Sequence, residues 1–395
     1  MFEENIKRLK EEGLFRQITD RGKIFRKEGG ISVPPAARIV IAGTEYANFA
    51  SNDYLGLSAS PALADAAIKA LRLFPFGASA SRLLSGGTEF HEELEKAVAR
   101  FKATEAALVF NSGYQANTSA IPAIAGEDDI IFSDELNHSS IVDGCRLSRA
   151  KKVIYPHRDV DNLSSLMQKE SSSRKIVITD TVFSMDGNIA PLHDLYSLYT
   201  SIPDIILYLD DAHGTGVLGQ GRGALAHFNL KPEPWIVQMG TFSKALGSFG
   251  AFVAASRELV DWLINSARGF IYSTAPPSCV VAASAAAIEI IEQDKSLNDR
   301  LWRNQRRAVA GIRNAGFEII SGETPILAVV VGDVAETLVF SGKLKQRHIY
   351  APAIRPPTVK TARIRITISA AHTDEDIDTL IEAFVELRKS ALFAK

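Results

Sequence analysis

The chain has 395 residues, of which 46% are hydrophobic and 23% are charged, a composition typical of globular proteins. Its 44 basic and 46 acidic residues give a formal net charge of -2, which provides no electrostatic reason to expect nucleic acid or a membrane surface as a partner. The length predicts two or three domains, and the two cysteines, Cys145 and Cys279, are too few for a disulfide framework and suit a reducing compartment.

The N-terminal residues 1–18 combine apolar and oppositely charged side chains in a pattern that predicts an amphipathic helix. This stretch lacks the uninterrupted apolar run of a signal peptide. The most apolar stretch of the chain, residues 279–288, is followed by Glu289 and is much shorter than the roughly 20 residues that span a bilayer. We therefore expect a cytoplasmic protein with no membrane partner.

Six short apolar segments, several of them rich in Val and Ile, are separated by helix-length stretches. This pattern predicts βα units around a buried, mostly parallel sheet, and hence an α/β fold. Open sheets of this kind bind ligands beyond the carboxyl ends of their strands, so the residues after each segment are the candidates for chemistry. The segments are 107–110, 129–132, 175–179, 205–209, 236–239 and 251–255.

The first segment continues through Ser112 and Gly113 into a predicted helix. A glycine turn at a helix N-terminus presents unpaired backbone N–H groups that attract a phosphate. The plainer interpretation is that Ser112 is an ordinary helix cap. After the second segment comes His138, whose flat ring would either stack on a flat cofactor or form a hydrogen bond within its loop.

The segment 205–209 ends in two carboxylates and an imidazole, those of Asp210, Asp211 and His213. A carboxylate at this position would pair with the cationic ring nitrogen of a pyridinium cofactor, or it would cap the following turn. Residues 214–219 also fit the G-x-G-x-x-G pattern of dinucleotide sites. Such a loop directly follows its strand and opens a long helix, whereas four residues intervene here, so the pattern argues against NAD.

Lys244 follows the segment 236–239 and lies among small residues and glycines. Burial beside neighbouring strands lowers the pKa of a lysine, so that its amine becomes a nucleophile for an aldehyde. Isolated lysines are usually solvated surface residues. The combination with Asp210 and His213 after the preceding strand favours the nucleophile.

After Pro276 and Pro277 the pattern changes to a long helical stretch over 278–316, followed by shorter strands and a closing helix over 373–388. This change predicts a second, smaller α+β domain. The predicted organisation is an N-terminal segment over 1–50 that packs with the small domain, a large cofactor-binding domain over 51–280, and the small domain over 281–395.

Seven short motifs occur in register over nearly the whole chain, from about Gly13 to Glu386. In this order they resemble the α-oxoamine synthases, a family of fold-type I enzymes that depend on pyridoxal 5'-phosphate (PLP). The motifs are Ser-Asn-Asp-Tyr-Leu-Gly-Leu at 51–57, Ser-Arg-Leu-Leu-Ser-Gly at 81–86 with His91, Ser-Gly-Tyr at 112–114, Phe-Ser-Met-Asp-Gly at 183–187, Asp-Asp-Ala-His-Gly-Thr-Gly at 210–216, Thr-Phe-Ser-Lys at 241–244 and Tyr-Ser-Thr at 272–274.

The resemblance implies a role for each residue around the cofactor ring. Lys244 would hold PLP as a Schiff base and act as the general base, and Asp210 would pair with the protonated pyridine nitrogen. His213 would contact the ring hydroxyl, while His138 would stack on the ring and Ser184 would lie near it.

The same resemblance implies a phosphate site that involves two subunits, and no metal. Its predicted residues are Ser112, Gly113, Tyr114, Thr241 and, from a second subunit, Thr274. The implied assembly is a homodimer with shared active sites.

Residues 351–365 resemble the branch of the family that joins L-alanine to a pimeloyl thioester, carried by coenzyme A or a carrier protein, in biotin synthesis. In that branch Arg363 matches the arginine that grips the substrate carboxylate, Asn52 a neighbouring polar contact, and Arg16 an N-terminal arginine near the substrate. The stretch 359–362 is about two residues shorter than the usual Pro-x-Gly-Thr segment. Glycine-using relatives and acetyl, succinyl or long acyl donors therefore stay open.

Two rival functions share the same cofactor residues. An aminotransferase on this fold would use a keto-acid acceptor and would release no carbon dioxide. A regulatory PLP-binding protein would keep the cofactor without turnover. The presence of Arg363 and Asn52 beside the cofactor set, without an added helix-turn-helix segment, argues against the regulatory protein.

Overall fold

The computed structural model describes residues 2–11, 15, 26–27, 30–31, 36–171, 174–201 and 205–389. Its largest sheet has seven strands in the order β5-β11-β10-β9-β8-β6-β7. Only β11 is antiparallel to its neighbours, which confirms the predicted α/β fold with a mostly parallel sheet. The strands are β5 (Ala106–Phe110), β6 (Ile130–Asp134), β7 (Lys151–Tyr155), β8 (Lys175–Asp180), β9 (Ile205–Asp210), β10 (Ile236–Thr241) and β11 (Ala251–Ala255).

Helices cover both faces of this sheet, so that its central strands are buried and almost entirely apolar. Along β5, Leu108 and Phe110 enter one apolar cluster, whereas Ala107 and Val109 enter the other, as the two-residue period of a strand requires. The helices beside the sheet are α3 (Glu89–Lys102), α4 (Gly113–Ile124), α5 (Ser139–Leu147), α6 (Val160–Lys169), α7 (Leu192–Ser201), α9 (Arg257–Ser266) and α11 (Ser278–Gln293).

The sequence pattern missed β7, which lies at one edge of the sheet. Lys151, Lys152 and Ile154 of this strand are exposed, and its apolar run covers only residues 153–155. Lysines are common on edge strands, where they oppose pairing with another chain. The six predicted segments, by contrast, all correspond to strands of the sheet.

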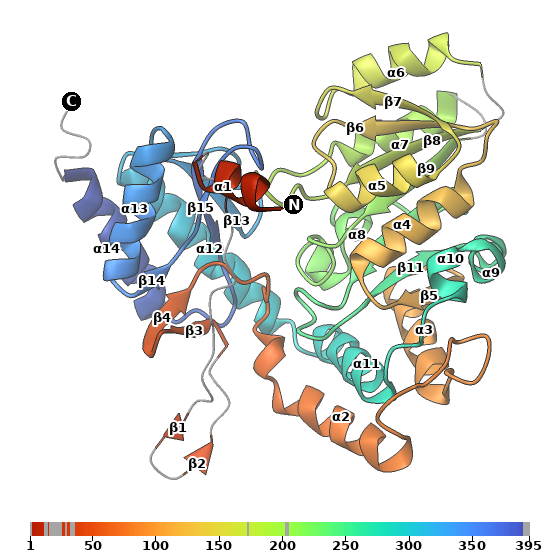
Figure 1. Cartoon of the computed structure of the whole chain (residues 1–395), viewed down its shortest axis with the longest axis horizontal. Helices are drawn as coiled ribbons and strands as arrows, with labels where there is room; N and C mark the ends of the chain where they lie inside the picture. The colour runs from red at the N-terminus through yellow and green to blue at the C-terminus, as the bar shows by residue number, and fades with distance from the viewer. Residues whose placement is uncertain are drawn as a thin grey trace.

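The C-terminal part forms a second, antiparallel sheet with the strand order β12-β13-β16-β15. Strand β14 pairs instead with β4, which joins the N-terminal β3–β4 hairpin to this part of the chain. Figure 1 shows these elements gathered beside the seven-stranded sheet, with α1 near β15. The elements are β3 (Arg38–Ile41), β4 (Thr44–Asn48), α12 (Ser296–Asn314), β12 (Glu318–Ile319), β13 (Ile326–Val330), α13 (Val334–Gln346), β14 (Ile349–Tyr350), β15 (Ala353–Ile354), β16 (Arg363–Thr367) and α14 (Asp374–Lys389).

The helical stretch predicted over 278–316 consists of two helices, because the chain leaves the helical conformation between α11 and α12. Asp294 is extended, and its Oδ1 accepts a hydrogen bond from the backbone N–H of Ser296 at 2.9 Å. An Asp side chain that accepts from the backbone N–H two residues further on forms an Asx turn, and this turn separates the two helices. The predicted closing helix corresponds to α14, and the domain boundaries at residues 50 and 280 stay a prediction.

The remaining elements are short or lie at the periphery. They are α1 (Glu3–Glu11), β1 (Arg26–Lys27), β2 (Gly30–Ile31), η1 (Leu57–Ala59), α2 (Pro61–Leu73), η2 (Gly219–Gly221), α8 (Ala224–His227) and α10 (Arg268–Ile271). Only the four-residue α8 follows the glycines at 214–219, so a dinucleotide loop is not formed there. Among the described residues, the structure contains no helix with the length and apolar character needed to cross a bilayer.

Candidate active site

Two buried carboxylates lie side by side at the carboxyl ends of β8 and β9, because the strand register pairs Asp180 with Asp210. Asp210 Oδ2 accepts a hydrogen bond from Asn117 Nδ2 at 2.8 Å, and its Oδ1 accepts one from the Ala212 backbone N–H at 3.1 Å. Burial raises the pKa of Asp210, against the opposing charge of Lys244. A bound cation would therefore favour the ionised carboxylate of Asp210.

Lys244, in the loop that follows β10, lines the same cavity as these carboxylates. Its Nζ lies 3.5 Å from Thr241 Oγ1. Burial lowers the pKa of the Lys244 amine, while the charges of Asp210 and Asp180 oppose this shift. A lysine amine with a lowered pKa is a better nucleophile at neutral pH, as the sequence predicts.

Lys244 and Asp210 line one cavity of about 200 Å³. The other residues around it are Gly113, Tyr114, His138, Ser140, Asp180, Ala212, His213, Met239, Thr241 and Ser243. The structure thus brings together most of the predicted cofactor residues, which come from four different stretches of the chain. Their individual roles stay predictions.

The start of α4 forms one end of this cavity. The first N–H groups of a helix have no partner within it and attract an anion such as a phosphate. Ser112 is the helix cap, because its Oγ accepts a hydrogen bond from the Gln115 backbone N–H at 3.2 Å. A Cβ on Gly113 would lie 2.8 Å from Thr241 Cγ2, so glycine allows the helix start to approach Thr241 closely.

His213 lines the same cavity and contacts Tyr54, a residue that the sequence did not single out. The Tyr54 hydroxyl lies 2.6 Å from His213 Nδ1, within a hydrogen bond. Burial lowers the pKa of His213 well below its ordinary value and raises the pKa of Tyr54 to about 12. Both groups are therefore neutral near pH 7. Tyr54 belongs to the motif at 51–57, and this motif could have indicated it as a site residue.

The two arginines of β16 have different partners. Arg363 forms an ion pair with Asp186, and its Nε donates to the Thr361 carbonyl at 2.9 Å. Arg365 Nη2 donates to Asn52 Oδ1 at 3.1 Å. The predicted polar neighbour Asn52 is thus joined to Arg365 and not to Arg363.

Arg365 is also the arginine that acts on the Lys244 cavity. Its charge lowers the pKa of Lys244 and of His213. Arg363 and Arg365 are both buried and lie two residues apart, on one face of β16. Because side chains of a strand alternate between its two faces, the sequence could have indicated Arg365 as a second candidate beside Arg363.

The other predicted residues lie outside the Lys244 cavity. Ser184 lines a neighbouring cavity of about 160 Å³ together with Asp186 and Arg363. Thr274 is exposed, and its carbonyl accepts a hydrogen bond from Asn111 Nδ2 at 2.9 Å. Arg16 lies outside the described residues.

A buried ion pair supports the turn that carries Asp210. The Lys102 side chain is completely buried, and its Nζ lies 2.7 Å from Asp211 Oδ2. Asp211 Oδ1 accepts hydrogen bonds from Thr181 Oγ1 at 2.7 Å and from the Ala224 backbone N–H at 3.2 Å. Asp211 is therefore fully engaged in structural contacts.

We expect Lys102→Met to destabilise the folded protein by about 3–5 kcal/mol, because it leaves the Asp211 carboxylate buried without its cation. The midpoint of urea unfolding measures this loss. Lys151→Met is the matched control, since Lys151 also lies 2.7 Å from a carboxylate, that of Glu170, but its side chain is 61% exposed. Exposed pairs contribute about 0–1 kcal/mol, so equal losses in the two variants would contradict the structural role of Lys102.

Three features define a PLP-dependent enzyme of fold type I. They are the mostly parallel sheet, the buried lysine amine in one cavity with a strand-end carboxylate, and the helix N-terminus at the same cavity. The family described as aminotransferase class I and II matches residues 44–384 of the chain. The 8-amino-7-oxononanoate synthase of Geobacter metallireducens is 45% identical over 394 residues, which cover 98% of each chain. The protein therefore belongs to the aminotransferase class I and II family and, within it, to the α-oxoamine synthases similar to 8-amino-7-oxononanoate synthase.

Solved structures show the same likeness. A serine palmitoyltransferase from S. paucimobilis with bound PLP and myriocin superposes with a TM-score of 0.89 at 27% identity, covering 98% of this chain and 96% of that one. The 8-amino-7-oxononanoate synthase of Francisella tularensis superposes with a TM-score of 0.74 at 27% identity, covering 86% and 97% of the two chains. PLP is the cofactor of the protein.

Proposed function

We propose that the protein condenses L-alanine with a pimeloyl thioester to form 8-amino-7-oxononanoate, with release of carbon dioxide and the free thiol. The observation that carries this proposal is the likeness, over 98% of the chain, to a relative named for this product. Two free, buried cysteines suit the cytoplasm, where we place this step of biotin synthesis.

The residues of the cavity divide the chemistry among them. When bound, PLP supplies an aldehyde that captures amines and a ring that withdraws charge from the substrate Cα. Asp210 would hold a proton on the ring nitrogen, and Lys244 would remove and return the proton at the alanine Cα. His138 would cover one face of the ring, and His213, which is bonded to Tyr54, would contact the ring hydroxyl.

We assign the carboxylate of alanine to Arg365, with Asn52 beside it. Arg365 is joined to Asn52 and acts electrostatically on Lys244, whereas the Arg363 guanidinium is already paired with Asp186. Arg363 then fixes the hairpin that carries Ser184, since Asp186 belongs to that hairpin.

A further cavity, of about 770 Å³, offers space for the acyl chain. Its lining is mostly apolar and includes one cation, Arg355, for which the described residues show no acidic partner. A pimeloyl chain has an apolar middle and a terminal carboxylate, which matches this lining. The residues are Leu9, Phe15, Met185, Ala353, Ile354, Arg355, Pro356, Pro357 and Thr358.

The proposed reaction is tested by an end-point assay of the purified protein with alanine, glycine or serine against pimeloyl, acetyl, succinyl and palmitoyl thioesters. Thiol release and product mass are followed, with both coenzyme A and carrier-protein forms of the pimeloyl group. We expect alanine with a pimeloyl thioester to give the highest kcat/KM and the mass of 8-amino-7-oxononanoate. A higher kcat/KM with glycine and acetyl-coenzyme A would overturn the proposal.

In the same assay we expect Arg355→Gln to lower kcat/KM for the pimeloyl thioester about 10-fold, because one charged hydrogen bond to a carboxylate contributes about 1.5 kcal/mol. The heptanoyl thioester lacks the terminal carboxylate and should be unaffected. Lys360→Gln is the control, since Lys360 is a highly exposed cation nearby. An equal loss with both thioesters would contradict the assignment of Arg355.

We also propose a homodimer in which Thr274 contributes to the phosphate site of the partner subunit. Thr274 is exposed and forms an isolated bridge with Ser81. Large apolar side chains are exposed on both sides of this bridge: Tyr272, near Thr274 in sequence, is 72% accessible, and Leu84, near Ser81 in sequence, is 82% accessible. Clustered exposed apolar side chains are typical of a protein interface, which supports this proposal.

A further inference from the structure

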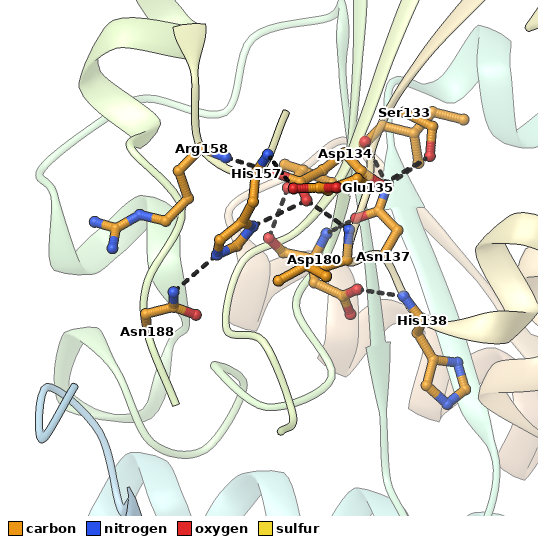
Figure 2. Close-up of polar contacts among 12 residues, drawn as sticks. Ser133, Asp134, Glu135, Asn137, His138, His157, Arg158, Asp180 and Asn188 are labelled. Atoms are coloured by element: carbon orange, nitrogen blue, oxygen red, sulfur yellow. Dashed lines mark hydrogen bonds and ion pairs between the residues drawn. The ribbon is translucent and has the colours of Figure 1, made fainter. Parts of the chain in front are cut away.

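A polar network connects the loop that carries His138 with the hairpin that carries Ser184 (Figure 2). Its centre is His157, which follows β7. His157 Nδ1 lies 2.9 Å from Asp134 Oδ1, at the end of β6, and His157 Nε2 lies 2.8 Å from Asn188 Nδ2, at the end of the hairpin. One imidazole therefore bridges two segments that carry residues of the proposed site.

On one side of the bridge, hydrogen bonds fix the path from Asp134 to His138. Asp134 is buried at the end of β6. Asn137 Oδ1 accepts a hydrogen bond from the Asp180 backbone N–H at 2.9 Å. The His138 backbone N–H donates to Asp180 Oδ2 at 2.7 Å, and the His138 ring lines the Lys244 cavity. Figure 2 shows this ring turned away from the network.

On the other side, the bridge holds the hairpin that begins at Phe183. The rings of His157 and Phe183 meet edge to face, with their centroids 4.3 Å apart and an angle of 88° between them. The Phe183 backbone N–H donates to the Asn188 carbonyl at 3.1 Å. The next carbonyl, that of Ser184, accepts a hydrogen bond from Arg365 Nε at 2.7 Å. These contacts connect His157, through the hairpin, to Arg365.

The amide of Asn188 is buried and incompletely satisfied. Within the described part of the chain, Asn188 Oδ1 is the buried side-chain oxygen without a hydrogen-bond partner. Turning the amide over would only exchange which of its two polar atoms is unpaired. An unpaired buried polar atom lowers stability, so the stability of the fold does not account for an asparagine at this position.

We propose that His157 is a positioning residue, which keeps the His138 loop and the Ser184 hairpin in register so that His138 and Arg365 face one bound PLP and its amino acid. The first half of this role concerns PLP alone, and the second half rests on the proposed function. His157 itself does not line the Lys244 cavity as the structure describes it.

The test uses His157→Phe, which keeps a ring against Phe183 and removes both hydrogen bonds. We expect the Kd of PLP, measured by titrating the apoprotein and following absorbance, to rise about 10-fold, which corresponds to one lost hydrogen bond. The control is His193→Phe, because His193 is exposed and packs edge-on against Phe228 at 5.2 Å. An unchanged Kd, or the same rise in the control, overturns the proposal.

Asn188→Ala separates the two halves of the role and serves if His157→Phe does not fold. It removes only the contact with the hairpin and leaves the bond between His157 and Asp134. We expect the KM for alanine to rise several-fold while the Kd of PLP stays unchanged. A rise in both constants, or in neither, contradicts the bridge. Because the Kd of PLP requires no acyl thioester, His157→Phe is interpretable whichever thioester the enzyme uses.

Discussion

Lys244→Ala is expected to lower kcat at least about 10³-fold and to remove the visible absorption of enzyme-linked PLP. The Lys244 amine is buried in the cavity beside Asp210, so no other group is held at the same place to capture the aldehyde or to carry the Cα proton. Absorption spectra and turnover with alanine and the pimeloyl thioester measure the two effects.

Two features make the Lys244 experiment specific. The control is Lys151→Ala, because Lys151 is an exposed lysine paired with Glu170 and should change neither the spectrum nor turnover. Free amines are removed by dialysis before the spectrum is recorded, since they react with PLP in solution. A visible band that persists in Lys244→Ala after this step would contradict the covalent role of Lys244.

Asp210→Asn is expected to lower kcat about 10²- to 10⁴-fold, because removing one partner of a buried ion pair costs roughly 3–5 kcal/mol. The neutral amide cannot hold the proton on the ring nitrogen, so the ring no longer withdraws charge from the substrate Cα. Since burial raises the pKa of Asp210, its ionised form is unfavourable in the apoprotein, and the apo variant should be at least as stable as the natural protein.

Asp211→Asn provides the matched comparison for Asp210→Asn. Asp211 is buried beside Asp210 in sequence but faces Lys102 and Thr181. We expect Asp211→Asn to lower the midpoint of thermal unfolding while the folded fraction keeps most of its turnover. Loss of turnover in both variants at unchanged stability would show that the two carboxylates had not been assigned correctly.

Most of the cofactor cavity could be predicted because its residues follow recognisable strands. Lys244, Asp210 and His213 each come directly after an apolar segment, and the carboxyl ends of parallel strands meet at one edge of a sheet. The edge strand β7 was missed because it begins with two exposed lysines, which leave only a short apolar run over 153–155. Asp180, which ends β8 beside Asp210, was missed because a lone carboxylate after a strand has no distinctive local signal.

By itself, the sequence determined the α/β class, the lysine and carboxylate pair and the family of the enzyme. These depend on local periodicity and on motifs whose residues lie close together in the chain. The tertiary structure alone decided that Arg365 rather than Arg363 meets Asn52, and that His157 bridges Asp134 and Asn188. Such partners are up to 313 residues apart in the sequence. Whether Arg363 or Arg365 meets Asn52 therefore depends on how the elements pack and not on sequence spacing.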